Sequence, residues 1–105
     1  MSDFEIKDSI LIKYTGEEKE VTIPNTVTGI GFDAFQRCSN LVSVTIPDSV
    51  TSISDFVFEN CSSLINIKIP DSVINIGNCT FRNCSSLVNI AIPNSVTSIG
   101  DLAFE

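Results

Sequence analysis

The sequence predicts a repeat solenoid of the α/β class, in which one short supersecondary unit stacks on copies of itself. The dipeptide Ile-Pro begins at residues 23, 46, 69 and 92, at a constant interval of 23 residues. Apolar residues recur at the same places in every copy. A unit of this length cannot bury its apolar face alone, and a fixed period of about 20–50 residues is typical of solenoids, which form a continuous core by stacking.

Rows of similar apolar residues identify the positions that face the core. Counted from each Ile-Pro, the copies span 23–45, 46–68, 69–91 and, incompletely, 92–105. Equivalent side chains of stacked copies lie one above another, so each packs on its own counterpart. The rows are Val27, Val50, Val73 and Val96; Ile30, Ile53, Ile76 and Ile99; Phe35, Phe58, Phe81 and Phe104; Cys38, Cys61 and Cys84; Leu41, Leu64 and Leu87; and Val21, Val44, Ile67 and Ile90.

The strand of each copy is predicted around its Ile-Pro. In the second copy, Val44 and Ile46 alternate with Thr45, which predicts a short strand with one buried face. Pro47 ends the strand because proline cannot donate to a β-ladder. Asp48 and the serine after it are typical of turns, since both side chains can bond to nearby backbone amides.

The rest of the copy is expected to form a second side and a short helical segment. Val50 and Ile53 predict the second side. Ser54-Asp55 resembles a helix N-cap and predicts one or two helical turns through Phe58 to Cys61. Glycine replaces Ser54 in the other copies, where a bend with positive φ is expected to favour it. These glycines are Gly31, Gly77 and Gly100.

Residues 1–20 do not fit the repeat register, and residues 1–22 are predicted to form an N-terminal capping hairpin. Its strands are expected at 4–7 and 10–14, on either side of a turn at Asp8-Ser9. A second turn at 15–18 leads back to the first repeat. Solenoids need such polar caps to shield the first rung from solvent.

Composition limits the possible function. At 105 residues the chain is expected to be one domain, without a membrane-spanning apolar stretch and without a signal peptide at Met1. A net charge of −7 and a pI near 4.3 argue against nucleic acid as a partner. Six of the thirteen acids lie in the predicted cap, where they favour solubility: Asp3, Glu5, Asp8, Glu17, Glu18 and Glu20.

The stretches 46–53, 60–64 and 83–87 resemble the leucine-rich repeats of the BspA-like class, and the resemblance covers residues 21–105. It implies a right-handed curved solenoid with parallel strands on the concave side and short helices or irregular coil on the convex side. It also implies a surface-exposed protein used for adhesion and protein binding. The usual Asn row after the strand is replaced by hydroxyl residues, which are expected to satisfy the turn amides: Thr26, Ser49, Ser72 and Ser95.

The cysteines predict a core ladder of free thiols rather than a metal site. Cys38, Cys61 and Cys84 occur once per copy, and the close C-x₂-C pairs of zinc sites are absent from the sequence. A structural disulfide between neighbouring copies is the less favoured alternative. Cys79 lies outside this row and is expected on the outer coil, where it would be the most reactive thiol or a neutral variation.

Catalysis and metal binding have little support. The sequence contains no histidine, which removes the usual general base and nucleophile partner, so no catalytic residue, cofactor or metal is predicted. Asp48 and Asp71 recur on successive copies and could together hold Ca²⁺. Turn capping explains them better, together with Asn25 and Asn94 at the same position.

A binding surface is expected on the outward positions of the predicted concave strands, which are small and polar and suit a protein or glycan partner. These positions differ between copies, which favours binding, but they lack the Trp, Tyr and Arg anchors that usually dominate binding energy. The positions are Glu20, Thr22, Ser43, Thr45, Asn66, Lys68, Asn89 and Ala91.

Two functions therefore stay open. The first is a non-catalytic interaction or adhesion module of a larger surface protein, and the second is a structural spacer without a ligand. The chain stops at Glu105, before the next Asn-Cys-Ser-Ser-Leu, which predicts an uncapped end exposing Val96, Ile99 and Phe104. Such an end could pair two copies as a homodimer.

Overall fold

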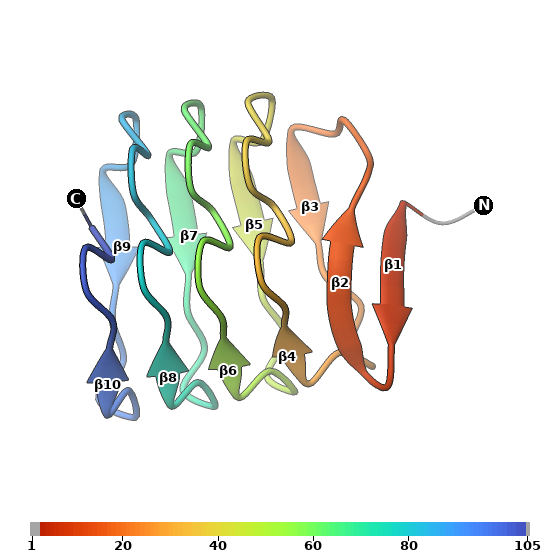
Figure 1. The fold of residues 1–105 in the computed structure, drawn as a ribbon, viewed down its shortest axis with the longest axis vertical. Helices are drawn as coiled ribbons and strands as arrows, with labels where there is room; N and C mark the ends of the chain where they lie inside the picture. The colour runs from red at the N-terminus through yellow and green to blue at the C-terminus, as the bar shows by residue number, and fades with distance from the viewer. Residues whose placement is uncertain (1–2, 105) are drawn as a thin grey trace.

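The computed structural model describes residues 3–104, except for the side chain of Asn89. It is a β-solenoid of about four turns, and Figure 1 shows its rungs stacked side by side from the N-terminal to the C-terminal end. The strands are β1 (Phe4–Lys7), β2 (Ile10–Tyr14), β3 (Glu20–Thr22), β4 (Gly29–Ile30), β5 (Ser43–Thr45), β6 (Ser52–Ile53), β7 (Asn66–Lys68), β8 (Asn75–Ile76), β9 (Asn89–Ala91) and β10 (Ser98–Ile99).

The strands form two sheets on two sides of the coil. One sheet has the order β1-β2-β4-β6-β8-β10 and the other has the order β3-β5-β7-β9. All neighbours are parallel except β1 and β2. Val44 pairs with Val21 on one side and with Ile67 on the other, at the predicted interval of 23 residues. The repeat register and both predicted sides of the coil are confirmed.

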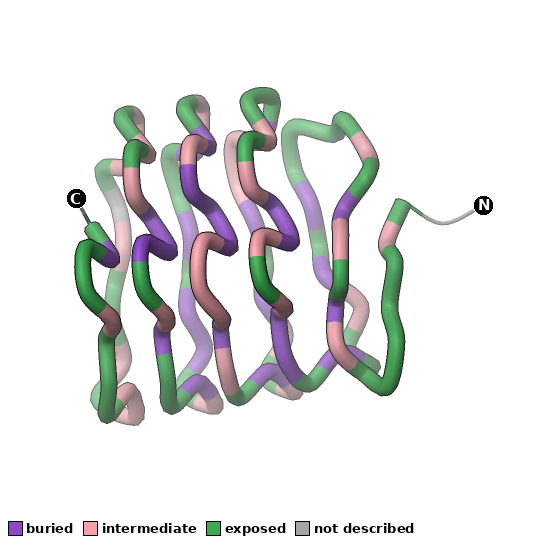
Figure 2. Tube along the Cα trace, viewed as in Figure 1, coloured by how far each residue is buried: buried purple, intermediate pink, exposed green. Residues whose placement is uncertain are grey.

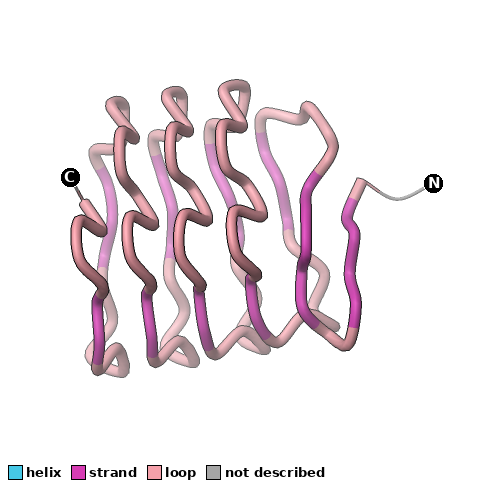
Figure 3. The backbone as a smooth tube through the Cα atoms, viewed as in Figure 1, coloured by secondary structure: helices cyan, strands magenta, loops and turns pink. Residues whose placement is uncertain are grey.

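The predicted helical segment and the α/β class are wrong. No helix occurs in residues 3–104, and Figure 3 shows loop between the short strands. In place of a helix, each of the three complete copies has a third side on which φ is positive at two positions, such as Phe56 (60°) and Asn60 (63°). A helix would turn each N–H back toward the carbonyl four residues earlier. Here alternate N–H groups donate to the next rung, and those between them, such as that of Gln36, donate to the carbonyl three residues earlier.

Aligned peptide groups hold this third side together. The N–H groups of Asp33 and Phe35 donate to the carbonyls of Asp55 and Val57 on the next rung, at 3.1 and 2.9 Å. The N–H of Phe56, in the same peptide group as the Asp55 carbonyl, donates onward to Asn78 at 2.9 Å. Each such peptide therefore accepts from the preceding rung and donates to the following one. These bonds between rungs alternate with local bonds three residues back, such as Gln36 to Asp33 at 3.1 Å, and the four-residue bonds of a helix do not form.

The residues that suggested a helix start also bond between rungs. The carboxylate of Asp55 accepts the N–H of Asn78 at 2.7 Å, and the side chain of Asn78 accepts the N–H of Asp101 at 2.7 Å. No glycine in the described residues has positive φ. A Cβ on Gly77 would lie 2.5 Å from the Ser54 carbonyl carbon, so this glycine is needed for close approach of two rungs rather than for a bend.

A stack of phenylalanines fills the core, as predicted. Phe35, Phe58 and Phe81 are buried, and Figure 2 shows buried residues recurring rung after rung. Their rings lie 5.3 and 5.5 Å apart at interplanar angles of 14° and 7°, and Phe104 continues the stack at 5.3 Å. Tyr14 of β2 extends it at the other end, 5.3 Å from Phe35.

The serine row works differently from the expectation. The hydroxyls of Ser49, Ser72 and Ser95 donate to backbone carbonyls of the preceding rung, at 2.6, 2.6 and 2.9 Å. The acceptors are Val27, Val50 and Val73. The turn itself is closed by its own backbone, since the N–H of Val50 donates to the Pro47 carbonyl at 3.1 Å. The hydroxyls therefore join rungs instead of satisfying turn amides.

The N-terminal hairpin has the predicted strands. β1 and β2 pair antiparallel, with Phe4 opposite Tyr14, and a bulge lies between Glu5 and Ile6. β2 then pairs parallel with β4, so the hairpin continues the larger sheet. β3, which falls within the predicted cap, is in register with β5. The division of the chain at residue 22 stays a prediction.

Phe58→Ala should destabilise the protein by about 3–5 kcal/mol, because it removes a ring that is stacked on both sides and leaves a cavity. Phe32→Ala is the matched control: Phe32 is 59% exposed, so the loss should stay below about 1 kcal/mol. Urea unfolding midpoints measure both. Equal losses would show that the Phe58 row is not the core.

Candidate functional site

The predicted binding positions lie together on the four-stranded sheet, on its side away from the core. Their two rows follow the β-ladder, in which Ser43 pairs with Asn66 and Thr45 with Lys68. Ser43 is half-buried, the side chain of Asn89 is outside the description, and the other six are exposed. We call these eight residues the outer rows: Glu20, Ser43, Asn66 and Asn89, and Thr22, Thr45, Lys68 and Ala91.

A groove of about 500 Å³ adjoins the outer rows where β5 and β7 end. Asp48 and Asp71 are exposed along it, and Lys68 is the cation in its lining. No residue in 3–104 hydrogen-bonds or ion-pairs with either carboxylate, nor with the side chains of Asn25 and Asn94 at the same position. The capping role predicted for these four residues is therefore wrong, because backbone bonds close the turns. The full lining is Thr45, Ile46, Pro47, Asp48, Lys68, Ile69, Pro70, Asp71 and Ser72.

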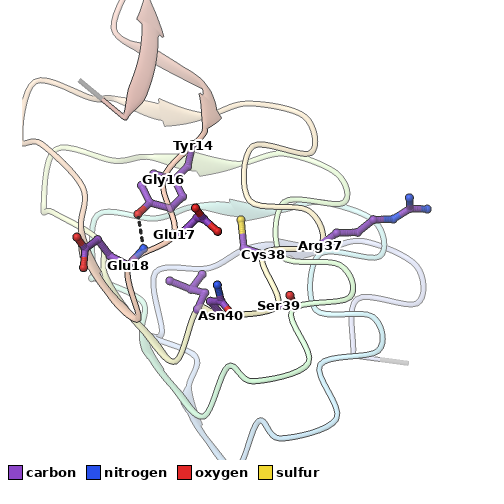
Figure 4. Close-up of a pocket in the computed structure, with 9 residues that line it drawn as sticks. Tyr14, Gly16, Glu17, Glu18, Arg37, Cys38, Ser39 and Asn40 are labelled. Atoms are coloured by element: carbon purple, nitrogen blue, oxygen red, sulfur yellow. Dashed lines mark hydrogen bonds between the residues drawn. The ribbon is translucent and has the colours of Figure 1, made fainter. Parts of the chain in front are cut away.

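A smaller hollow of about 190 Å³ lies between the hairpin and the first repeat (Figure 4). The N–H of Glu18 donates to the Tyr14 hydroxyl at 3.1 Å on one side, and Arg37 and Cys38 line the other. Sequence reasoning did not find this hollow. The sequence feature that could have predicted it is the break in the repeat register between the hairpin and the first Ile-Pro. Two unlike rungs meet there and cannot pack as identical copies do.

The cysteine row is a ladder of free thiols bonded to the backbone. The thiols of Cys61 and Cys84 donate to the carbonyls of Phe35 and Phe58, each at 3.0 Å, and all four cysteines are unpaired. Burial raises the pKa of the Cys61 thiol above its usual range and that of Cys84 to about 11. Burial also raises the pKa of Cys38, against the opposing charge of Lys13.

The expectation for Cys79 is wrong. Its residue is only 6% exposed, although Leu102 at the same position of the next copy is 50% exposed. Asp33 and Phe56, at the same position of the first two copies, are half-buried, and Leu102 lies on the last described rung, where no further described rung covers it. Cys79 therefore belongs with the protected thiols rather than on the reactive outer coil.

The last described rung carries the predicted apolar end. Ile99 is 46% exposed and Phe104 is 47% exposed, while Val96 is half-buried. A hollow of about 400 Å³ opens beside Phe104, between it and the half-rung that includes Val88 and Ile90. The expectation that concerns Glu105 falls outside the described residues.

Within residues 3–104, no three His, Cys, Asp or Glu side chains are placed to share a metal ion. In the same part of the chain, no helix has the length and apolar character needed to span a bilayer.

The fold and its surface define the class of protein: a β-solenoid of 23-residue rungs whose two sheets carry polar residues on their outward faces. The family profile described as a BspA type leucine-rich repeat region matches residues 5–105 as six copies. The chain belongs to this family. No curated protein sequence matches the chain significantly.

Several solved structures share the fold. The leucine-rich repeat protein TpLRR of T. pallidum is 27% identical with a TM-score of 0.84, over 96% of this chain and 62% of that one. A leucine-rich repeat protein from Bacteroides ovatus ATCC 8483 is 40% identical with a TM-score of 0.80, over 92% of this chain and 27% of that one. The pneumococcal vaccine antigen PcpA, at 21% identity and a TM-score of 0.86, shows the fold alone, over 92% of this chain and 24% of that one. The chain thus spans less than two thirds of each.

Native thiol labelling should modify Cys38 and Cys84 before Cys61 and Cys79, because the last two are buried. A thiol with a pKa of about 11 instead of 9.0 holds about 100-fold less thiolate near pH 8. Labelling of Cys84 should therefore quicken about tenfold per pH unit as the pH rises toward 11.

Mass spectrometry after timed alkylation, between pH 8 and 10, would measure these rates. The same reaction in urea is the control and should label all four cysteines alike. Labelling of Cys79 first in the native protein, or a Cys61–Cys84 disulfide, would contradict the assignment.

Proposed function

We propose that the chain is a non-catalytic binding module of a longer surface protein, and that the outer rows contact its partner. The observation that carries the proposal is the contrast between the two faces of the four-stranded sheet. Facing the core, Val44 is followed by Ile67 and Ile90, which are similar. Facing outward, Thr45 is followed by Lys68 and Ala91, which are not. Packing in the core explains why the residues of the first row are similar. Packing does not explain why the residues of the second row differ.

The similar structures support a surface role within a larger chain. One of them is described as a leucine rich cell surface protein from Faecalibacterium prausnitzii A2-165, at 26% identity and a TM-score of 0.54. The absence of histidine from the sequence supports a role without catalysis, because the commonest general base and nucleophile partner is missing.

A structural spacer is the second candidate function. It is favoured by the small side chains of the outer rows, which contain no aromatic residue and no arginine to act as a binding anchor. A spacer needs only the stacked core and would tolerate any polar residue at the outer rows.

Substitution of two residues in the outer rows distinguishes the two candidate functions. The variant Thr45→Ala/Lys68→Ala should keep its unfolding free energy within about 1 kcal/mol, because both residues are exposed. Wild type and variant would be immobilised and compared on arrays of glycans and of purified extracellular proteins. A ligand held by the wild type and lost by the variant supports binding, whereas identical profiles or no ligand favour the spacer.

We further propose that the 105-residue chain self-associates through the last described rung. Ile99→Lys should reduce dimerisation, because it places a charge on the apolar surface around Ile99 and Phe104 and beside the strand edges of β9 and β10. Ile74→Lys is the matched control, since Ile74 is 45% exposed but lies on the third repeat. Sedimentation over a concentration series is the measurement. A monomer at high micromolar concentration, or equal effects of both variants, would contradict this proposal.

A further inference from the structure

We propose that the groove between the second and third repeats binds an arginine side chain of the partner, held between the carboxylates of Asp48 and Asp71. The inference rests on the proposed function, because Thr45 and Lys68 belong both to the outer rows and to the lining of the groove. It names the partner's chemistry: an extended protein segment that carries arginine.

The two carboxylates have no structural task. The turn that each belongs to is closed by backbone bonds, from Val50 to Pro47 and from Val73 to Pro70, both at 3.1 Å. The bond to the neighbouring rung comes from the serine that follows each aspartate, not from the aspartate itself. Among the described residues neither carboxylate has a hydrogen-bond or ion-pair partner. Both are exposed on the rim of a groove of about 500 Å³ and so are open to a ligand.

Spacing and charge favour a guanidinium group. Asp48 and Asp71 occupy equivalent positions on rungs whose strands β5 and β7 pair in register, so they repeat at the strand spacing of about 4.8 Å. A guanidinium is planar and carries five N–H donors in a fixed fork, which lets one group reach two neighbouring carboxylates. With Lys68 the lining has a net charge of −1, and one monovalent cation neutralises it. Ca²⁺ would need about 6–8 oxygen ligands, more than these two carboxylates supply.

The floor of the groove suits the rest of an arginine side chain. Pro47 and Pro70 line it beside Ile46 and Ile69, whose side chains are buried. This apolar surface can cover the three methylene groups of arginine while its charged end stays at the rim. The Lys68 ammonium lies on the same groove and can donate to a backbone carbonyl of the bound segment.

The chain contains its own control for this site. The first and fourth repeats carry Asn25 and Asn94 where the second and third carry Asp48 and Asp71. The variant Asp48→Asn/Asp71→Asn therefore installs residues that the same turn already accepts, and its urea midpoint should equal that of the wild type. It removes the charge of the site and leaves the shape.

The experiment is an NMR titration of the ¹⁵N-labelled chain with an N-acetylated, C-amidated Gly-Ser-Arg-Ser-Gly peptide. Shifts should concentrate at the amides of residues 45, 46, 48, 68, 69, 71 and 72 and be absent around Asn25 and Asn94. The double variant should bind about tenfold more weakly or worse, because it loses charge-assisted hydrogen bonds. Peptides with citrulline or lysine in place of arginine should also bind more weakly, citrulline the most.

Equal affinity of the double variant, shifts elsewhere on the surface, or the same shifts from CaCl₂ without peptide would overturn the arginine site. Its failure can be told from failure of the proposed function. If the peptide shifts nothing but a ligand still depends on Thr45 and Lys68, the groove assignment falls and the binding module stands. If the peptide binds at the groove but no partner depends on the outer rows, the arginine site stands and the assignment of the outer rows falls.

Discussion

The structure depends on hydrogen bonding between rungs, which keeps successive copies at a constant spacing and in the same register. Strand ladders supply it on two sides, and aligned peptides of the third side supply it on the remaining one. Because each rung sits directly on its neighbour, every residue meets its own counterpart 23 positions away. Phe58 therefore has Phe35 below it and Phe81 above it, and the core is a set of columns. The exact period of the sequence follows from this constraint, since an inserted residue would shift every column at once.

The columns could be predicted from sequence because burial acts on residue type and the period makes each type recur. The Phe row and the strand around Thr45 were predictable in this way, whereas the hairpin strands were predictable from the apolar residues on either side of the Asp8-Ser9 turn. The third side was not, because Ser54-Asp55 followed by apolar residues has the pattern of a helix start. In the structure the Asp55 carboxylate accepts the N–H of Asn78, 23 residues on, and a local pattern cannot distinguish that bond from a cap. Gly77 shows the same limit of sequence analysis. A glycine is required there because a Cβ would collide with the Ser54 backbone of the preceding rung, and this contact is seen only once the rungs are stacked.

The candidate site likewise has one part that could be predicted from sequence, the outer rows, and one part that could not, the groove. Alternation in the strands places the outer rows, so Thr45 and Lys68 could be assigned outward from sequence. The groove beside them could not be, because aspartate after proline has a ready explanation in turn chemistry. Only the structure shows that backbone bonds close the turn and that the side chains of Asp48 and Asp71 take no part in closing it. In this protein, the absence of the capping bond expected of an aspartate therefore indicates a binding role better than the residue type does.

The aligned peptides of the third side also give the solenoid a direction. In each aligned peptide, such as that between Asp55 and Phe56, the carbonyl points toward the N-terminal rung and the N–H toward the C-terminal rung, so the dipoles of these peptides add along the axis as they do in a helix. The two ends of this side differ: at the N-terminal end the Ala34 carbonyl accepts the N–H of Tyr14 at 3.0 Å, whereas the last described rung presents the N–H groups of Leu102 and Phe104. A further rung can extend this side only if it presents carbonyls, so growth by repetition is vectorial. Two copies meeting through their last rungs would oppose like poles there and could join only along the edges of β9 and β10.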